Sequence, residues 1–283
     1  MKMTFVFSLL LSSFPSPSAP SSSGTSSSWK PAWKGPVFVV FPGFGLKRSD
    51  YDGFLPTYDV VGPELLYPPT KEEIDAILPR TDAFQQWFTE TMATYDQLLD
   101  ELADVPVILF GHSAGIMMAA ECALKKRKNV AALVTYGGAP WSQSRVDTPC
   151  PTLVLCGKED SIASPRFHAA AVAAKAPPSR SAKIPFPVEY RSVKGADHYA
   201  VVSEEGARRS IVLNAAIRGE DVPPDDSVGS LMRSSSEAQR HMDDIHAKII
   251  AFMGRLSYAD GYGGSVIYPL WFGTFMDMLS SCF

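Results

Sequence analysis

Apolar positions fall into two alternating patterns through the middle of the chain. Short apolar runs that stop at glycine or proline predict strands buried on both faces, at residues 37–41, 105–110, 130–136 and 151–156, with a last strand at 188–193. Longer segments predict helices at residues 82–102, 114–126, 165–175, 204–217 and 237–256, the first with apolar side chains at clear helical spacing. Strands that alternate with helices predict an α/β fold, a mostly parallel twisted sheet with helices on both faces.

Local signals mark several helix ends. Asp82 is a candidate N-cap for the helix over 82–102. Ser164 followed by Pro165 is typical of an N-cap and a first helical position. The helix over 114–126 is predicted to have a basic last turn, which suits the negative end of the helix dipole. Residues 218–237 contain prolines, aspartates and a serine run, and predict an exposed loop.

The N-terminal residues 1–30 differ from the folded middle. Lys2 precedes an apolar run from Met3 to Leu11, a serine- and proline-rich stretch follows to about Ser28, and Asp50 is the first acidic residue. A basic start with a short apolar run is typical of a secretory signal, and the serine-rich continuation without acids resembles an organelle transit peptide. We therefore expect a leader that directs the chain to the secretory pathway or a plastid rather than the cytoplasm, with a disordered tail as the alternative.

The folded domain is predicted to cover residues 31–257, and an aromatic-rich segment follows over residues 258–283. This segment has two interpretations. It could dock on the core of the domain, or it could form a lid or a peripheral membrane contact beside an apolar substrate site. Pro269 and Asp277 interrupt any helix that would span a membrane.

Composition narrows the class of protein. The chain has 26 basic and 30 acidic side chains and a formal net charge of −4, which argues against nucleic acid as a partner. The four cysteines are scattered and show no CxxC spacing, so neither a disulfide framework nor a structural zinc site is expected. Composition indicates a soluble globular protein.

The clearest chemical motif is Gly111-His112-Ser113-Ala114-Gly115, which fits the pattern G-x-S-x-G. It lies between a predicted strand and a predicted helix, the context in which such a turn presents a serine hydroxyl as a nucleophile. A serine needs a neighbouring base, and the candidates are His112, His168, His198, His241 and His246. We predict His198, because it lies just after the last strand, where the carboxyl ends of parallel strands form the ligand-binding edge.

The base also needs a carboxylate that fixes its tautomer. Asp160 follows the strand over 151–156 and is the predicted acid, with the neighbouring Glu159 as the alternative. Acyl transfer further needs N–H donors for the developing oxyanion. We predict the N–H of Ala114, next to the nucleophile, and the N–H of Phe44 in the glycine-containing loop after the first strand.

With the order Ser113, Asp160, His198, the chain resembles the α/β-hydrolase superfamily over about residues 35–256. Only residues 137–150 separate the two strands between which cap domains are usually inserted, so the chain is most similar to the capless, dienelactone-hydrolase or chlorophyllase-like branch. It departs from the family patterns at three positions. Pro42 replaces the histidine of the common oxyanion loop, Ser113 replaces the cysteine of dienelactone hydrolases, and Ile116 replaces a glycine of many lipases and chlorophyllases.

The sequence therefore predicts a serine hydrolase that cleaves a carboxylic ester through an acyl-enzyme, without cofactor or metal. A small-molecule or lipid ester is the expected substrate, and thioesters or chlorophyll esters remain alternatives. A binding protein that keeps the fold without turnover and a lyase or acyltransferase on the same fold are the competing hypotheses.

Overall fold

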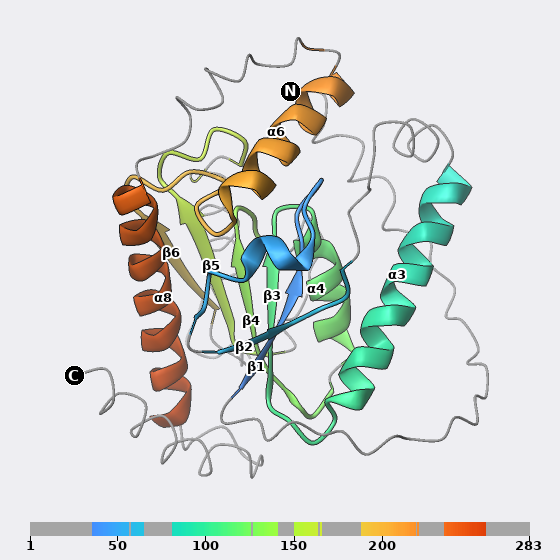
Figure 1. Cartoon of the computed structure of the whole chain (residues 1–283). Helices are drawn as coiled ribbons and strands as arrows, with labels where there is room; N and C mark the ends of the chain where they lie inside the picture. Colours follow the sequence, from blue (N-terminus) through green and yellow to red (C-terminus); the bar gives the residue numbers. More distant parts are fainter. Residues whose placement is uncertain are drawn as a thin grey trace, which may run out of the picture.

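A parallel sheet organises the described part of the chain in the computed structural model (Figure 1). The structure describes residues 36–56, 58–64, 81–125, 127–140, 150–163, 165, 188–218, 220 and 235–258. Six strands pair in the order β2-β1-β3-β4-β5-β6, every pair parallel. The strands are β1 (Val37–Phe41), β2 (Asp59–Val61), β3 (Val107–His112), β4 (Val130–Tyr136), β5 (Thr152–Gly157) and β6 (Val188–Val193). The helices are the short 3-10 helix η1 (Arg48–Tyr51), α3 (Thr81–Glu101), α4 (Gly115–Leu124), α6 (Glu204–Arg218) and α8 (Ser235–Tyr258).

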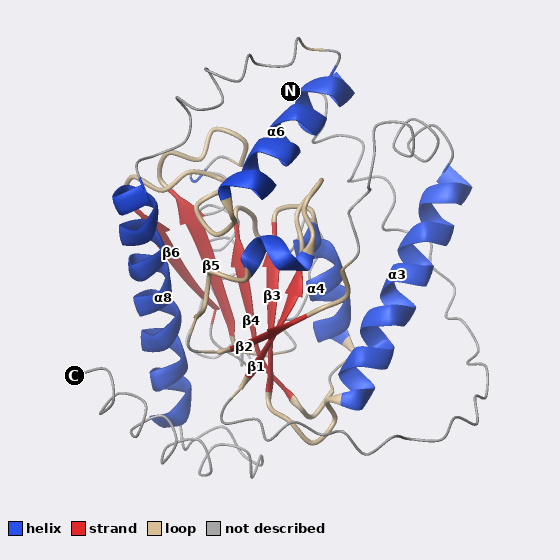
Figure 2. Cartoon of the chain, viewed as in Figure 1, coloured by secondary structure: helices blue, strands red, loops and turns tan. Residues whose placement is uncertain are grey.

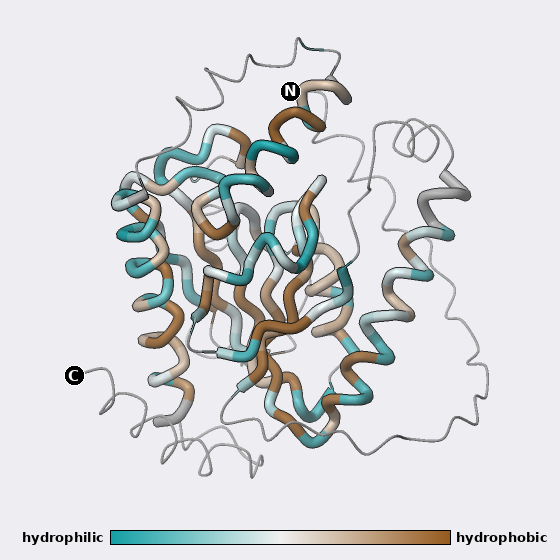
Figure 3. Tube along the Cα trace, viewed as in Figure 1, coloured by the Kyte–Doolittle hydropathy of each residue, from teal (hydrophilic) through white to brown (hydrophobic). Residues whose placement is uncertain are grey.

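Each face of the sheet is buried by a different set of elements, as Figure 2 shows. Successive side chains of a strand point to opposite faces, so β1 contributes Val37, Val39 and Phe41 to one core and Phe38 and Val40 to the other. Helices α3 and α4 cover the first face. Helix α8 covers the second face, together with the segment around residues 51–55. This double cover explains why the central strands are mostly apolar (Figure 3).

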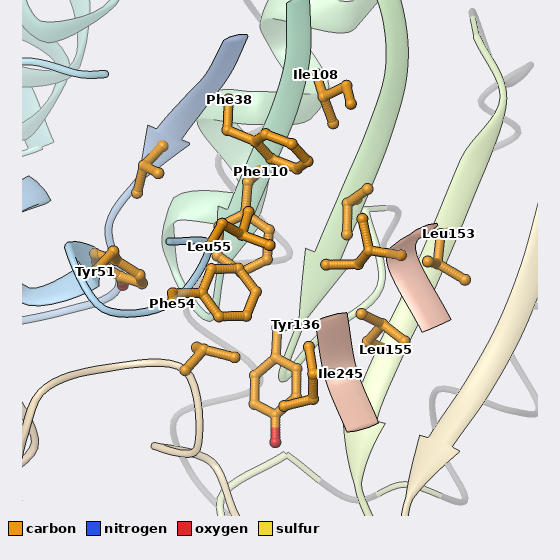
Figure 4. Close-up of a cluster of buried hydrophobic side chains, with 14 of the residues drawn as sticks. Phe38, Tyr51, Phe54, Leu55, Ile108, Phe110, Tyr136, Leu153, Leu155 and Ile245 are labelled. Atoms are coloured by element: carbon orange, nitrogen blue, oxygen red, sulfur yellow. The ribbon is translucent and has the colours of Figure 1, made fainter. Parts of the chain in front are cut away.

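The core on the α8 face joins residues that are far apart in the sequence. Phe38 and Phe110 from the strands meet Phe54 from the segment after η1 and Ile245 from α8 (Figure 4). The rings of Phe54 and Phe110 lie 4.7 Å apart between centroids. Aromatic and aliphatic packing of this kind stabilises the fold mainly through the apolar area that it removes from water.

Strand register brings the loops that follow β1, β3, β5 and β6 to one edge of the sheet. Phe41 pairs with Gly111 and Tyr136 pairs with His112, so β1, β3 and β4 end at the same level. Gly157 pairs with Val193, so β5 and β6 also end together. The carboxyl edge of the sheet therefore collects the segments that hold the predicted site residues.

The predicted fold class is confirmed, with differences at particular elements. Strand β2 was not predicted, because three residues are too few to show a pattern. Asp82 is not an N-cap, since α3 already begins at Thr81. Helix α4 ends at Leu124, so the predicted basic last turn is wrong: Lys125 lies beyond the helix.

Several predictions fall on residues that the structure does not describe. They are the leader over residues 1–30, the Ser164 N-cap, the helix over 165–175 apart from Pro165, most of the loop over 218–237, and the aromatic segment apart from Tyr258, the last residue of α8. No helix in the described ranges combines the length and the hydropathy that crossing a bilayer requires.

Candidate active site

Ser113 occupies the sharp turn between β3 and α4. Its φ of 51° makes it the one non-glycine residue with positive φ in the described part of the chain. The turn needs small neighbours, because a Cβ on Gly115 would lie 2.1 Å from the carbonyl oxygen of Phe41, and one on Gly111 would lie 2.8 Å from Cα of Ile116. Ser113 remains partly exposed. The predicted G-x-S-x-G turn thus has the strained backbone and close packing that present a hydroxyl at the sheet edge.

The imidazole of His198 lies between the serine and a carboxylate. Its Nε2 is 2.8 Å from Oγ of Ser113, and its Nδ1 is 2.8 Å from Oδ2 of Asp160. A carboxylate can only accept, so Nδ1–H donates to Asp160 and Nε2 is left to accept the Ser113 hydroxyl. The structure therefore brings together the three residues predicted as nucleophile, base and acid.

Asp160 is held by donors on both of its oxygens. Oδ2 faces His198, while Oδ1 accepts the N–H groups of Ile162 at 2.9 Å and Ala163 at 2.7 Å. Burial opposes ionisation of this carboxyl, but the hydrogen bond and charge of His198 and the two N–H donors together lower the pKa of Asp160 below its ordinary value. Glu159, the alternative acid, is exposed. The geometry favours Asp160 as the partner of His198.

The loop that holds the acid and the loop that holds the histidine are joined through their backbones. Lys158 N–H donates to the carbonyl of Val193 at 2.8 Å, and Glu159 N–H donates to that of Ala196 at 3.0 Å. Gly137, at φ +69°, completes the wall behind the ring, since a Cβ there would lie 2.9 Å from both Nδ1 and Cε1 of His198. Sequence reasoning took Gly137 only as the end of a strand and missed this contact.

The loop after β1, which contains the predicted oxyanion donor Phe44, lies against the serine turn. A Cβ on Gly43 would be 3.2 Å from Cβ of Ser113. Two backbone carbonyls of this loop accept hydrogen bonds. The carbonyl of Gly43 accepts the N–H of Leu46 at 3.0 Å, and the carbonyl of Phe44 accepts the hydroxyl of Ser210 at 2.7 Å. The other predicted donor, the N–H of Ala114, directly follows Ser113 at the start of α4. Both predicted donors therefore belong to segments that adjoin the nucleophile.

The remaining histidines have other surroundings. His112 is fully buried, with Nδ1 2.8 Å from the Tyr51 hydroxyl and Nε2 2.8 Å from the carbonyl oxygen of His198. Burial, followed by the proximity of His198, lowers the pKa of His112 to about 3. His241 and His246 lie on α8, and His168 lies outside the described residues.

Three of the four cysteines lie within the described ranges. Cys122, Cys150 and Cys156 are buried free thiols, and burial raises the pKa of each to about 12. Within the described ranges, no three histidine, cysteine, aspartate or glutamate side chains gather as metal ligands would.

Comparison with known proteins gives similarity to solved structures alone. No family model matches the chain, and no curated protein matches it. It is similar to the esterase PE8, with a TM-score of 0.43 and 18% identity over 66% of this chain and 92% of that one. It is also similar to the RedJ thioesterase of prodiginine biosynthesis in Streptomyces coelicolor (TM-score 0.40, 17% identity, 66% and 86% covered) and to a thermophilic esterase from Thermogutta terrifontis (0.40, 16%, 65% and 90%). At these identities, the function must be inferred from the chain's own residues.

Proposed function

We propose that this protein is a serine hydrolase of the α/β-hydrolase fold that cleaves a carboxylic ester. One observation carries the proposal. The continuous contact from Ser113 Oγ to His198 to Asp160, with both links at 2.8 Å, starts from a serine held at positive φ at the carboxyl edge of a parallel sheet. A binding protein has no physical need for this combination.

In the proposed mechanism, His198 first acts as a base. Its Nε2 takes the hydroxyl proton of Ser113 while Oγ attacks the carbonyl carbon of the ester. Asp160 stays ionised and stabilises the imidazolium that forms. The imidazolium then gives its proton to the departing alkoxide, and the acyl group remains on Ser113.

Release of the acyl group repeats these steps with water. His198 takes a proton from a water molecule, the resulting hydroxide attacks the acyl-enzyme, and Ser113 leaves with the proton that His198 returns. In both halves the N–H groups of Phe44 and Ala114 are assigned to the oxyanion. Loss of one such donor typically costs about 3–4 kcal/mol of transition-state stabilisation.

The leaving atom defines the alternatives within this proposal. A thioester or a lipid ester would use the same nucleophile, base and acid, so the choice among them rests on side chains around the site. We therefore propose a carboxylic ester, and the substrate series below varies its acyl part and its leaving atom.

The proposal is tested by labelling and turnover. We expect a fluorophosphonate probe to label the wild-type protein and the label to be lost in Ser113→Ala. p-Nitrophenyl esters of graded chain length should be hydrolysed by the wild type and not by this variant. Matched thioesters, assayed beside the esters, would separate the two substrate classes.

A second serine variant serves as the control. Ser192 lies on the edge strand β6, and Ser192→Ala should label and turn over like the wild type. Labelling that persists in Ser113→Ala would move the nucleophile elsewhere. A folded wild-type protein that neither labels nor hydrolyses any ester would favour a binding protein on this fold.

A further inference from the structure

A buried tyrosine hydroxyl joins the loop after β1 to the serine turn. Tyr51, the last residue of η1, is fully buried in the core on the α8 face (Figure 4). Its hydroxyl oxygen lies 3.0 Å from the backbone nitrogen of Gly43 and 2.8 Å from Nδ1 of His112. Gly43 immediately precedes Phe44, and His112 immediately precedes Ser113.

The hydrogen bonds through this hydroxyl can run in one direction only. The carbonyl of His198 can only accept, so the proton of the His112 ring is on Nε2 and donates to that carbonyl at 2.8 Å. Nδ1 is then an acceptor and takes the hydroxyl proton of Tyr51. The Tyr51 oxygen in turn accepts the N–H of Gly43, which completes an ordered chain of three donors.

The Tyr51 hydroxyl and the His112 imidazole both keep the protonation state that these three hydrogen bonds require. Burial is the largest effect on Tyr51 and raises its pKa well above the ordinary value, so the hydroxyl keeps its proton. Burial also keeps His112 neutral, as described above. Each member donates to the next and has no charge to solvate, which suits a fully buried network.

The two ends of this series of hydrogen bonds lie on separate parts of the proposed catalytic site. One end is the peptide before the predicted oxyanion donor, and the other is the backbone of the proposed base. We propose that Tyr51 and His112 are positioning residues that fix the oxyanion loop and His198 relative to Ser113. This inference rests on the proposed hydrolase function, and neither residue is assigned any contact with the substrate.

The test is Tyr51→Phe, which removes one oxygen and keeps the ring. Without the Tyr51 hydroxyl, the oxyanion loop and His198 should no longer be held in place relative to Ser113. We therefore expect kcat to fall roughly 10- to 100-fold while KM changes little, as expected for a displacement in the site. The second-order rate of fluorophosphonate labelling at Ser113 should fall in parallel. Circular dichroism and the unfolding temperature would establish that the variant is folded.

Tyr95→Phe is the matched control. Tyr95 is equally buried, and its hydroxyl donates to the carbonyl of Val40 at 2.9 Å without contacting His112 or His198. Tyr95→Phe should be destabilised about as much as Tyr51→Phe, but it should keep the wild-type kcat. Equal kcat losses in the two variants, or wild-type kcat in folded Tyr51→Phe, would overturn the inference.

Nitrogen chemical shifts of the His112 ring give a readout independent of turnover. Long-range proton–nitrogen spectra of the wild type at neutral pH should show the neutral Nε2–H form. A protonated ring or the Nδ1–H form would overturn the inference even in an active enzyme. Conversely, a wild type that never labels at Ser113 would refute the proposed function, and the ring spectrum would still report the hydrogen-bond chain.

Discussion

Ser113 has a backbone conformation that costs a non-glycine residue roughly 1–3 kcal/mol. The surrounding structure compensates for this cost, since Ser113 N–H donates to the carbonyl of Tyr136 at 3.0 Å and its own carbonyl accepts Ile116 N–H at 3.1 Å. Gly111 and Gly115 allow the close approach of strand and helix on either side. This turn places the Ser113 hydroxyl within reach of His198, and a glycine, although easier to accommodate here, would have no hydroxyl.

At the same scale, we predict that Asp160→Asn lowers kcat by roughly 10⁴-fold, as expected when the base is held in the wrong tautomer. The amide would donate toward Nδ1 of His198 and drive the ring proton to Nε2, where the serine needs an acceptor. The measurement is kcat on the best p-nitrophenyl ester, with circular dichroism to verify folding.

Glu159→Gln is the control for this prediction. It alters an exposed side chain next to the acid and should leave kcat near the wild-type value. Near-normal turnover in Asp160→Asn would assign the acid to another residue.

Sequence alone locates Ser113, Asp160 and His198, which the structure brings into contact, because each follows a predicted strand in a loop that contains glycine. It does not locate the partners of His112. The bond to Tyr51 spans 61 positions and that to His198 spans 86, so no local spacing reports them. The sequence does exclude His112 as the base, because a ring adjacent to the nucleophile on a sharp turn must point elsewhere.

Helix α6 holds the loop after β1 from above the sheet edge (Figure 1). Arg209 Nε donates to the carbonyl of Gly45 at 3.0 Å, and the same guanidinium forms an ion pair with the buried Asp50. Ser210 contributes the bond to Phe44 described above. The sequence predicts the helix over 204–217, but the loop against which this helix packs depends on tertiary contacts that the sequence pattern does not contain. Strand β2 was not predicted for the same reason, because its pairing with β1 is a tertiary contact.

We predict that Arg209→Met lowers the free energy of unfolding by about 3 kcal/mol, because it leaves the Asp50 carboxylate buried without its counter-charge. Urea unfolding followed by circular dichroism is the measurement. Lys47 N–H, 2.8 Å from Asp50 Oδ2, would remain as a partner but carries no charge.

The adjacent Arg208→Met is the control. Arg208 pairs at 3.8 Å with Glu204, and their side chains are 39% and 69% exposed, so its loss should change the free energy of unfolding by less than about 1 kcal/mol. Equal destabilisation by the two variants would mean that the buried ion pair contributes no more than a surface one.

For the molecule as a whole, the sheet has one hydrophobic core on each face, and these two cores explain why the sequence predicts the strands and their covering helices well. Continuous apolar strands can only be buried on both sides, and amphipathic helices such as α3 supply the cover. The same burial also makes the stability of the protein depend on pH, because it encloses a titratable imidazole ring at the centre of the protein. His112 is fully buried and neutral, and its pKa is about 3.

An ordinary histidine takes up a proton near pH 6.5, so below that pH the unfolded chain is protonated at His112 while the folded chain is not. Acid therefore favours unfolding, and this residue removes about 1.4 kcal/mol of stability per pH unit from pH 6.5 down toward pH 3. Urea midpoints at pH 7, 6, 5 and 4 would measure the slope. His112→Gln should flatten it, and an unchanged slope would contradict the argument. The ring that is proposed to keep the two loops aligned would then also make the folded protein less stable in acid.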